Sequence, residues 1–252
     1  MIARLCAGAI AAFGLVHGAA ASELRVYSTI AVQAPLEEMI PKFEAGTGHK
    51  LSVQWATATM LVKRIEGGEK ADVVILTDSG MDLLAKEGKV VPGSIAPLAS
   101  APVAIGIKAG TPKPDISTPE ALKRSLLSAK AISYTDPATG GASGVYFAKL
   151  LDRMGIADKM KSKTKFPPPG GFSATLLQTG EVDIAIQQKS ELMHIPGTEI
   201  IGPLPGELAM ATNFATGLGT GSSEMAAARA LADFLHSPEA AAVFQRTGLN
   251  AL

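Results

Sequence analysis

Residues 131–154 read AISYTDPATGGASGVYFAKLLDRM, and this stretch decides the fold class. Its first part, 131–135, predicts a strand, and its last part, from about 142 to 154, predicts a helix. The loop between them is rich in glycine and in small or hydroxylated residues. Strand-like and helix-like segments alternate in this way along the chain, which favours an α/β fold with mainly parallel strands over a sandwich or a bundle.

The same alternation extends in both directions from this stretch. Before it, the pattern predicts strands at 24–28, 51–55 and 72–76 with helices at 35–45 and 61–66 between them. A second series contains a strand at 103–107, a helix opened by 117–119, the strand and helix of 131–154, a helix at 173–179 and a strand at 182–187. Two more helices follow in 222–247, separated by Ser237 and Pro238. Two series of this kind predict two lobes.

Composition excludes several classes of function. The chain has 252 residues, 47% of them hydrophobic, so it can bury a large core. Its 23 basic side chains balance 23 acidic ones and form no run, which argues against a nucleic acid partner. The four histidines are isolated, and no HExxH, CxxC, GxSxG, P-loop or GxGxxG pattern is present. We therefore expect no metal and no cofactor.

The N-terminus, residues 1–22, is typical of a secretory signal peptide. Arg4 gives a positive start, 5–16 are apolar, and Ala19, Ala20 and Ala21 are small residues suited to cleavage. The apolar run is shorter than the roughly 20 residues that span a bilayer. Cleavage would remove Cys6, the only cysteine. We expect a mature protein in the periplasm that is monomeric, has no disulfide and has no membrane span.

Four loops follow predicted strands, and in open α/β sheets ligands bind at the carboxyl ends of strands. These loops are 28–33, 56–60, 136–144, and 169–172 together with the strand end Gln187 and Gln188. They are nearly free of charge, so they predict a site where backbone amides and hydroxyl groups hold an anion. For the glycine-rich loop, an ordinary turn capped by Ser143 is an equally good interpretation.

Longer motifs connect these segments to a known family. They are LRVYSTIAVQAPLEEMIPKFEAGTGHKLSVQWA (24–56), MLVKRIEGGEKADVVILTD (60–78), DPATGGASGVYFAKLLDRMG (136–155), GEVDIAIQQ (180–188) and ALADFLHSPEAAAVFQRTGL (230–249). With these motifs the chain resembles the type II periplasmic solute-binding proteins of ABC importers, specifically the molybdate- and tungstate-binding family. The resemblance covers residues 24–252.

The resemblance implies an α/β protein of two lobes, each a mainly parallel sheet flanked by helices. Lobe I would comprise 23–101 plus 212–252, and lobe II would comprise 102–211. The chain would cross between them at 100–104 and 208–214. A small anion would bind in the cleft, the lobes would close on a hinge, and an ABC permease would be the partner.

The resemblance also implies the site residues. Two serine ligands of the family fall on Ala31 and Ala58, a valine amide falls on Pro169, and a tyrosine falls on Gln187. Ser143 keeps its family role. The candidate ligand-binding residues are Thr29, Ala31, Thr57, Ala58, Thr59, Gly141, Ser143, Gly170, Phe172 and Gln187. Because donors are lost, we expect poor molybdate binding, so that a carboxylate or other organic anion becomes a candidate ligand beside an oxyanion.

Two other functions stay open. An isomerase that interconverts cis- and trans-aconitate is similar to the same family, and such an enzyme needs a general base beside the substrate carbon. The sequence does not identify this catalytic residue: Asp136, Lys189, His194 and the tyrosines are the candidates. A binding protein that serves a sensor kinase is the third interpretation.

Overall fold

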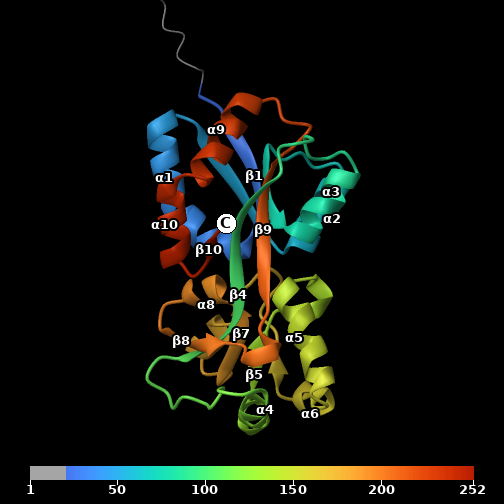
Figure 1. The fold of residues 1–252 in the computed structure, drawn as a ribbon, viewed down its shortest axis with the longest axis vertical. Coiled ribbons are helices and arrows are strands. Elements are labelled where there is room, and N and C mark those ends of the chain that lie inside the picture. Colours follow the sequence, from blue (N-terminus) through green and yellow to red (C-terminus); the bar gives the residue numbers. More distant parts are fainter. Residues whose placement is uncertain (1–20) are drawn as a thin grey trace, which may run out of the picture.

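The computed structural model describes residues 21–252, which form two lobes stacked along the long axis of the molecule (Figure 1). The strands are β1 (Glu23–Thr29), β2 (Lys50–Ala56), β3 (Val73–Thr77), β4 (Ala96–Lys108), β5 (Ile132–Tyr134), β6 (Thr164–Lys165), β7 (Ile184–Gln188), β8 (Thr198–Pro203), β9 (Ala211–Leu218) and β10 (Asn250–Ala251). Most of the signal peptide predicted at 1–22 lies outside the described residues.

Helices cover both lobes. They are α1 (Gln33–Thr47), α2 (Ala58–Glu66), α3 (Asp78–Lys86), α4 (Pro119–Ser128), α5 (Ala142–Arg153), α6 (Ala157–Lys161), α7 (Thr175–Gln178), α8 (Lys189–Met193), α9 (Met225–Leu235) and α10 (Pro238–Arg246), with 3₁₀ turns η1 (Ile30–Val32), η2 (Pro137–Thr139) and η3 (Gly206–Leu208). Lobe I holds β1 to β3, β9 and β10 with α1 to α3, α9 and α10, and lobe II holds β5 to β8 with α4 to α8. Within residues 21–252, no helix has both the length and the apolar composition needed to cross a membrane.

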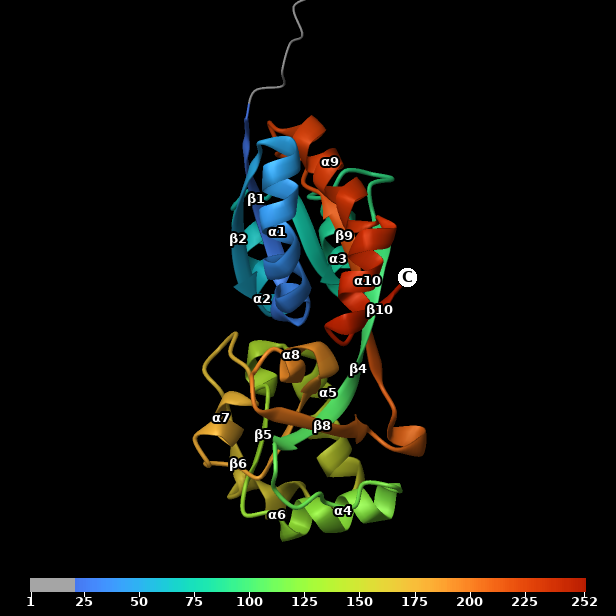
Figure 2. The ribbon, with the colours of Figure 1, turned by 90° about the vertical axis from the view of Figure 1, so that its left-hand side faces the viewer.

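One long strand, β4, belongs to both lobes. Its residues 96–102 pair with β9, and its residues 103–108 pair with β7 and β8, so the sheet order is β2-β1-β3-β9-β4-β7-β5-β6. Figure 2 shows β4 passing from the upper lobe to the lower one. The residue ranges expected for the two lobes stay a prediction.

The predicted α/β class is confirmed, but the sheets are mixed rather than mainly parallel. β1 runs parallel to β2 and β3, and β5 runs parallel to β6 and β7. In contrast, β4 runs antiparallel to β7, β8, β9 and β10, and β9 runs antiparallel to β3. β4 and β9 carry the chain between the lobes in opposite directions, so these two strands are antiparallel to each other.

Helices pack on both faces of each sheet, which explains why the central strands are almost wholly apolar. In lobe I, β1 and β3 direct Leu24, Val26 and Val73 toward α1, α9 and α10, and Val74 and Leu76 toward α2 and α3. In lobe II, one face packs on α4 to α6 and the other on α7 and α8. With both faces covered, the carboxyl ends of the strands are the natural place for a ligand.

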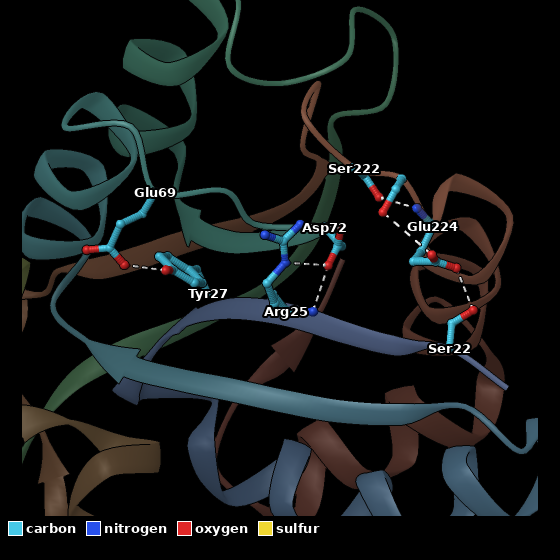
Figure 3. A network of polar contacts seen from close by, with 8 residues as sticks. Ser22, Arg25, Tyr27, Glu69, Asp72, Ser222 and Glu224 are labelled. Atoms are coloured by element: carbon cyan, nitrogen blue, oxygen red, sulfur yellow. Dashed lines mark hydrogen bonds and ion pairs between the residues drawn. The ribbon is translucent and has the colours of Figure 1, made fainter.

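A polar network at one edge of lobe I contains a buried carboxylate (Figure 3). Asp72 is 1% exposed, and its Oδ2 accepts hydrogen bonds from Arg25 N at 2.8 Å and Arg25 Nε at 3.1 Å. Arg25 Nη2 donates to Oδ1 at 3.1 Å. Burial acts to raise the pKa of Asp72, but the hydrogen bonds from Arg25 outweigh it and hold the pKa below its ordinary value.

Replacing Asp72 by alanine should lower the free energy of unfolding by about 2 kcal/mol, because Arg25 N and the guanidinium lose their acceptor. This loss of unfolding free energy is smaller than for a fully buried ion pair, because the Arg25 side chain is partly exposed. The contribution of the pair is present above the unfolded pKa of about 3.9 and disappears as the pH falls through the lower folded pKa. Urea unfolding of Asp72→Ala and wild type measures both effects.

The matched control is Lys42→Ala, which breaks the exposed ion pair between Lys42 and Glu239. That change should cost less than about 1 kcal/mol. Equal losses in the two variants would contradict the special role of the Arg25–Asp72 pair.

Candidate functional site

A small cavity of about 30 Å³ lies between the lobes at the carboxyl ends of the strands. Thr29 ends β1, Thr77 ends β3, and Gln188 ends β7, so strands of both lobes converge on it. The lining residues are Thr29, Ile30, Ala31, Thr57, Ala58, Thr77, Thr135, Gly141, Ala142, Ser143, Gln188, Glu191 and Phe214. No lysine or arginine is among them.

Most of the candidate residues come together here. The six that line the cavity are Thr29, Ala31, Thr57, Ala58, Gly141 and Ser143. Thr59 lies just beside it, in an adjoining groove.

Three candidates, Gly170, Phe172 and Gln187, do not line the cavity. The Phe172 ring packs on His194, with ring centroids 4.8 Å apart, and the loop at Gly170 passes close to Ala56. Gln187 is fully buried: its Oε1 accepts from Ser173 N at 2.7 Å, and its Nε2 donates to Thr135 Oγ1 at 3.1 Å. The neighbouring Gln188 lines the cavity instead, because successive side chains of a strand point to opposite faces.

Three helices begin at the cavity wall. Thr57 caps α2, Thr77 caps α3, and Gly141 precedes α5 without any side-chain cap. The first N–H groups of a helix have no partner inside the helix, and the helix dipole makes this end positive. Helices from both lobes thus present positive ends to one small space, which favours an anion.

Thr29 lines this space, and its hydroxyl group is buried. Thr29 is 4% exposed, and its Oγ1 has no hydrogen-bond partner among the described residues. Leaving a buried hydroxyl unpaired costs about 1–3 kcal/mol. Within the described part of the chain, Ser133 and Ser173 have unpaired buried hydroxyls as well, but of the three residues only Thr29 lines the cavity.

Glu191 also lines the cavity, although it is not among the residues predicted from the sequence. It is 4% exposed, its Oε2 accepts from Gln188 N at 3.2 Å, and burial raises its pKa to about 8. Gln188 and Glu191 have the spacing of a capping box, which the sequence does contain. The spacing of the capping box does not predict that α8 is buried between the lobes.

The residues proposed as a general base lie elsewhere. Asp136, Lys189 and His194 do not line the cavity. Asp136 Oδ1 accepts from Ala138 N at 2.9 Å as the cap of η2, and His194 Nε2 lies 3.8 Å from Glu37 Oε2. Within residues 21–252, no group of three or more His, Cys, Asp or Glu side chains is arranged to hold a metal ion.

Hydrogen bonds between the lobes close the cavity. Thr57 Oγ1 donates to Thr139 O at 2.8 Å, and Thr59 Oγ1 donates to Gly140 O at 3.1 Å. On the side of α8, Ser190 Oγ donates to Ala31 O at 2.7 Å. Both ends of the cavity are therefore held by contacts that form only when the lobes meet.

A groove of about 580 Å³ adjoins the cavity, and the two share Ala58, Thr77 and Ala142. The groove runs between α2 and α3 of lobe I and α5 of lobe II, and Lys63 and Lys149 line it from opposite lobes. The three shared residues have short side chains.

Comparisons with known proteins agree with this geometry. The family model for bacterial extracellular solute-binding proteins matches residues 24–250. An aconitate isomerase from a Pseudomonas species is 32% identical over 233 residues, which cover 90% of this chain and 87% of that protein. The molybdate-binding protein ModA of Escherichia coli K12 is 23% identical over 251 residues, which cover 98% and 97%.

Solved structures share the fold. The periplasmic molybdate-binding protein of Azotobacter vinelandii superimposes with a TM-score of 0.74 at 17% identity, covering 90% of this chain and 98% of that one. The family model spans nearly the whole described chain. The chain therefore belongs to the bacterial extracellular solute-binding proteins, with the two-lobed fold of the type II periplasmic binding proteins.

Proposed function

We propose that this protein captures a small anion in the interlobe cavity, in the periplasm, and delivers it to an ABC permease. The observation that carries this proposal is a cavity walled by the N-termini of α2, α3 and α5 and lined by Thr29, whose buried hydroxyl has no partner within residues 21–252. Neutral donors of this kind bind a desolvated anion without a fixed counter-charge. The expected monomeric state and the export signal are part of the same proposal.

A thermal-shift panel on the chain from residue 23 tests this function. The probes are sulfate, molybdate, cis-aconitate, trans-aconitate and other di- and tricarboxylates. A ligand present at about a hundred times its Kd adds about 2.7 kcal/mol to stability. We expect organic carboxylates to exceed molybdate, because Ala31 and Ala58 present methyl groups to the cavity. A panel without any shift would refute anion capture.

Replacing Thr29 by valine should stabilise the ligand-free protein by about 1 kcal/mol and weaken binding of the best panel anion about tenfold. Valine has nearly the same shape but carries no hydroxyl to leave unpaired, and it cannot donate to the anion. Urea unfolding and titration calorimetry measure the two effects. Thr47→Val is the control, since its hydroxyl already donates to Phe43 O at 2.8 Å far from the cavity. Lower stability of Thr29→Val with unchanged affinity would contradict this role.

A second function, isomerisation of a tricarboxylic acid, is favoured by one observation: the acidic residue Glu191 lines the cavity. The 32% identity to an aconitate isomerase supports it. A proton shift along a carbon chain needs a group that takes and returns the proton at the reacting carbon. A cavity of about 30 Å³ admits few water molecules, so such a substrate would extend into the adjoining groove.

Incubation with cis- or trans-aconitate, followed by chromatography, separates the two functions. Interconversion by the wild type that is lost in Glu191→Gln would support the isomerase. Tight binding without interconversion would support capture alone.

A further inference from the structure

Glu191 is a buried acid that lines the ligand cavity, and within residues 21–252 it forms no ion pair with a cation. Its carboxyl group accepts one hydrogen bond, from Gln188 N, and no arginine or lysine of the described chain forms an ion pair with it. A buried carboxyl group with so little compensation is stable in its neutral form, which carries a proton and can donate a hydrogen bond. The capping-box spacing of Gln188 and Glu191 explains the hydrogen bond from Gln188 N to the Glu191 carboxyl group. It does not explain why an acidic residue lines the cavity.

The elements packed against α8 do not supply a counter-charge. They are β4, β7, β8, η1 and α1. Neither η1 nor β7 has a titratable residue. The charged groups of β4 and β8 have other partners: Lys108 of β4 donates to Gln178 O, and Glu199 of β8 pairs with Lys113. The charged groups of α1 also have other partners. Glu37 lies near His194, Glu38 pairs with Arg246, Lys42 pairs with Glu239, and Glu44 pairs with Lys50. On α8 itself, Lys189 is partly exposed and does not line the cavity.

We propose that the neutral carboxyl group of Glu191 donates its proton as a hydrogen bond to an oxygen of the bound anion and so determines both the specificity and the pH dependence of binding. This inference rests on the proposed anion capture. Glu191 and Thr29 lie on opposite lobes, so the two side chains would hold the anion from both sides together with the α5 amides. An ionised Glu191 would instead place a second negative charge beside the anion and expel it.

The direction of the pH effect follows from this chemistry. With a pKa of about 8, Glu191 is mostly neutral at neutral pH and ready to donate. A bound anion disfavours the ionised form of Glu191 further. Above about pH 8, the protein must therefore take up one proton when it binds the anion. The affinity should then fall by up to about tenfold for each pH unit.

Titration calorimetry with the anion that gives the largest thermal shift, among sulfate, molybdate and the two aconitates, tests the proposal. Wild type, Glu191→Gln and Glu191→Leu are compared at about pH 6.5 and about pH 9. Buffers of different ionisation enthalpy count the protons taken up. The wild type should lose affinity toward pH 9 and take up close to one proton. Glu191→Gln keeps a neutral donor, so it should bind up to about tenfold more weakly at pH 6.5 and show no further loss.

The outcomes separate this inference from the function on which it rests. Glu191→Leu should lose at least about tenfold more affinity than Glu191→Gln, and Thr29→Val should keep the pH slope of the wild type. A wild-type affinity that is flat with pH, or the same slope in Glu191→Gln, would overturn the role of Glu191 while leaving anion capture intact. Absence of binding by the wild type at both pH values would overturn anion capture itself.

Discussion

Replacing Gly140 by alanine should weaken binding of the best panel anion by at least about a hundredfold, because the added methyl group would hold the lobes apart. Gly140 has φ +73°, and a Cβ at this position would overlap Thr59 Oγ1 and lie 2.5 Å from Thr59 Cβ. Thr59 belongs to the other lobe and is β-branched, so its side chain has little freedom to move away. Separation of the lobes would prevent Thr29 and the α5 amides from reaching the same anion.

Titration calorimetry measures the loss, and small-angle scattering with the anion present measures the lobe separation. Gly155→Ala is a close control: Gly155 is also in lobe II and has φ +67°, but a Cβ added there would meet nothing within 4 Å. Both variants carry the left-handed backbone cost of about 1–2 kcal/mol, but only Gly140→Ala meets the other lobe. Equal affinities in the two variants would contradict steric control of closure.

Replacing Ser143 by proline should also reduce anion affinity at least about a hundredfold. Ser143 is 1% exposed and lies in the first turn of α5, where its N–H group has no partner inside the helix. Proline removes this donor, and the first turn is the part of a helix that tolerates proline. The expected result is a folded protein that no longer holds the anion, which calorimetry and thermal unfolding measure together.

Two variants separate the contributions in this loop. Ser143→Ala keeps the amide and loses only the hydroxyl, so it should cost about tenfold or less. Asp136→Asn preserves the cap of η2 outside the cavity and should leave affinity within a few-fold of the wild type. If Ser143→Pro folds and binds as well as Ser143→Ala, the amide is not a ligand donor.

Local signals were sufficient for the elements around the glycine-rich loop. The strand and helix predicted in 131–154 correspond to β5 and α5. The caps at Thr118 and Ser237 begin α4 and α10 where the sequence indicates. These features depend on residues close in the chain, which is why a single sequence reveals them.

The strands that join the lobes were harder to predict. β4 begins at Ala96, well before the predicted 103, and contains Pro97 and Pro102, which argue against a strand. The strand tolerates Pro97 because the pairing with β9 shifts register between Pro97 and Ala99. β9 (ATNFATGL) has no long apolar run and is buried by β3 and β4, which lie far away in the sequence. Tertiary pairing, rather than propensity, forms both strands.

In the candidate site, too, some features could be predicted from local sequence and others depend on tertiary packing. The loops that follow strands could be assigned to the cleft from the fold rule, and Thr29, Thr57 and Ser143 meet there. The sequence could not decide between Gln187 and Gln188, since one residue of register exchanges the two faces of a strand. It also could not reveal Glu191, because the burial of that residue arises from the packing of α8 against η1 and α1.

The position of β9 has a consequence for the order in which the protein folds. When the chain becomes available from its N-terminus onward, β3 (VVILT) is complete long before residues 211–218, which pair with its free edge. Meanwhile β5, β6 and β7 can assemble with the second half of β4, so lobe II can be finished first. Until β9 arrives, an apolar strand edge is open to pairing with other chains, which makes the unfinished lobe I the segment most prone to aggregate.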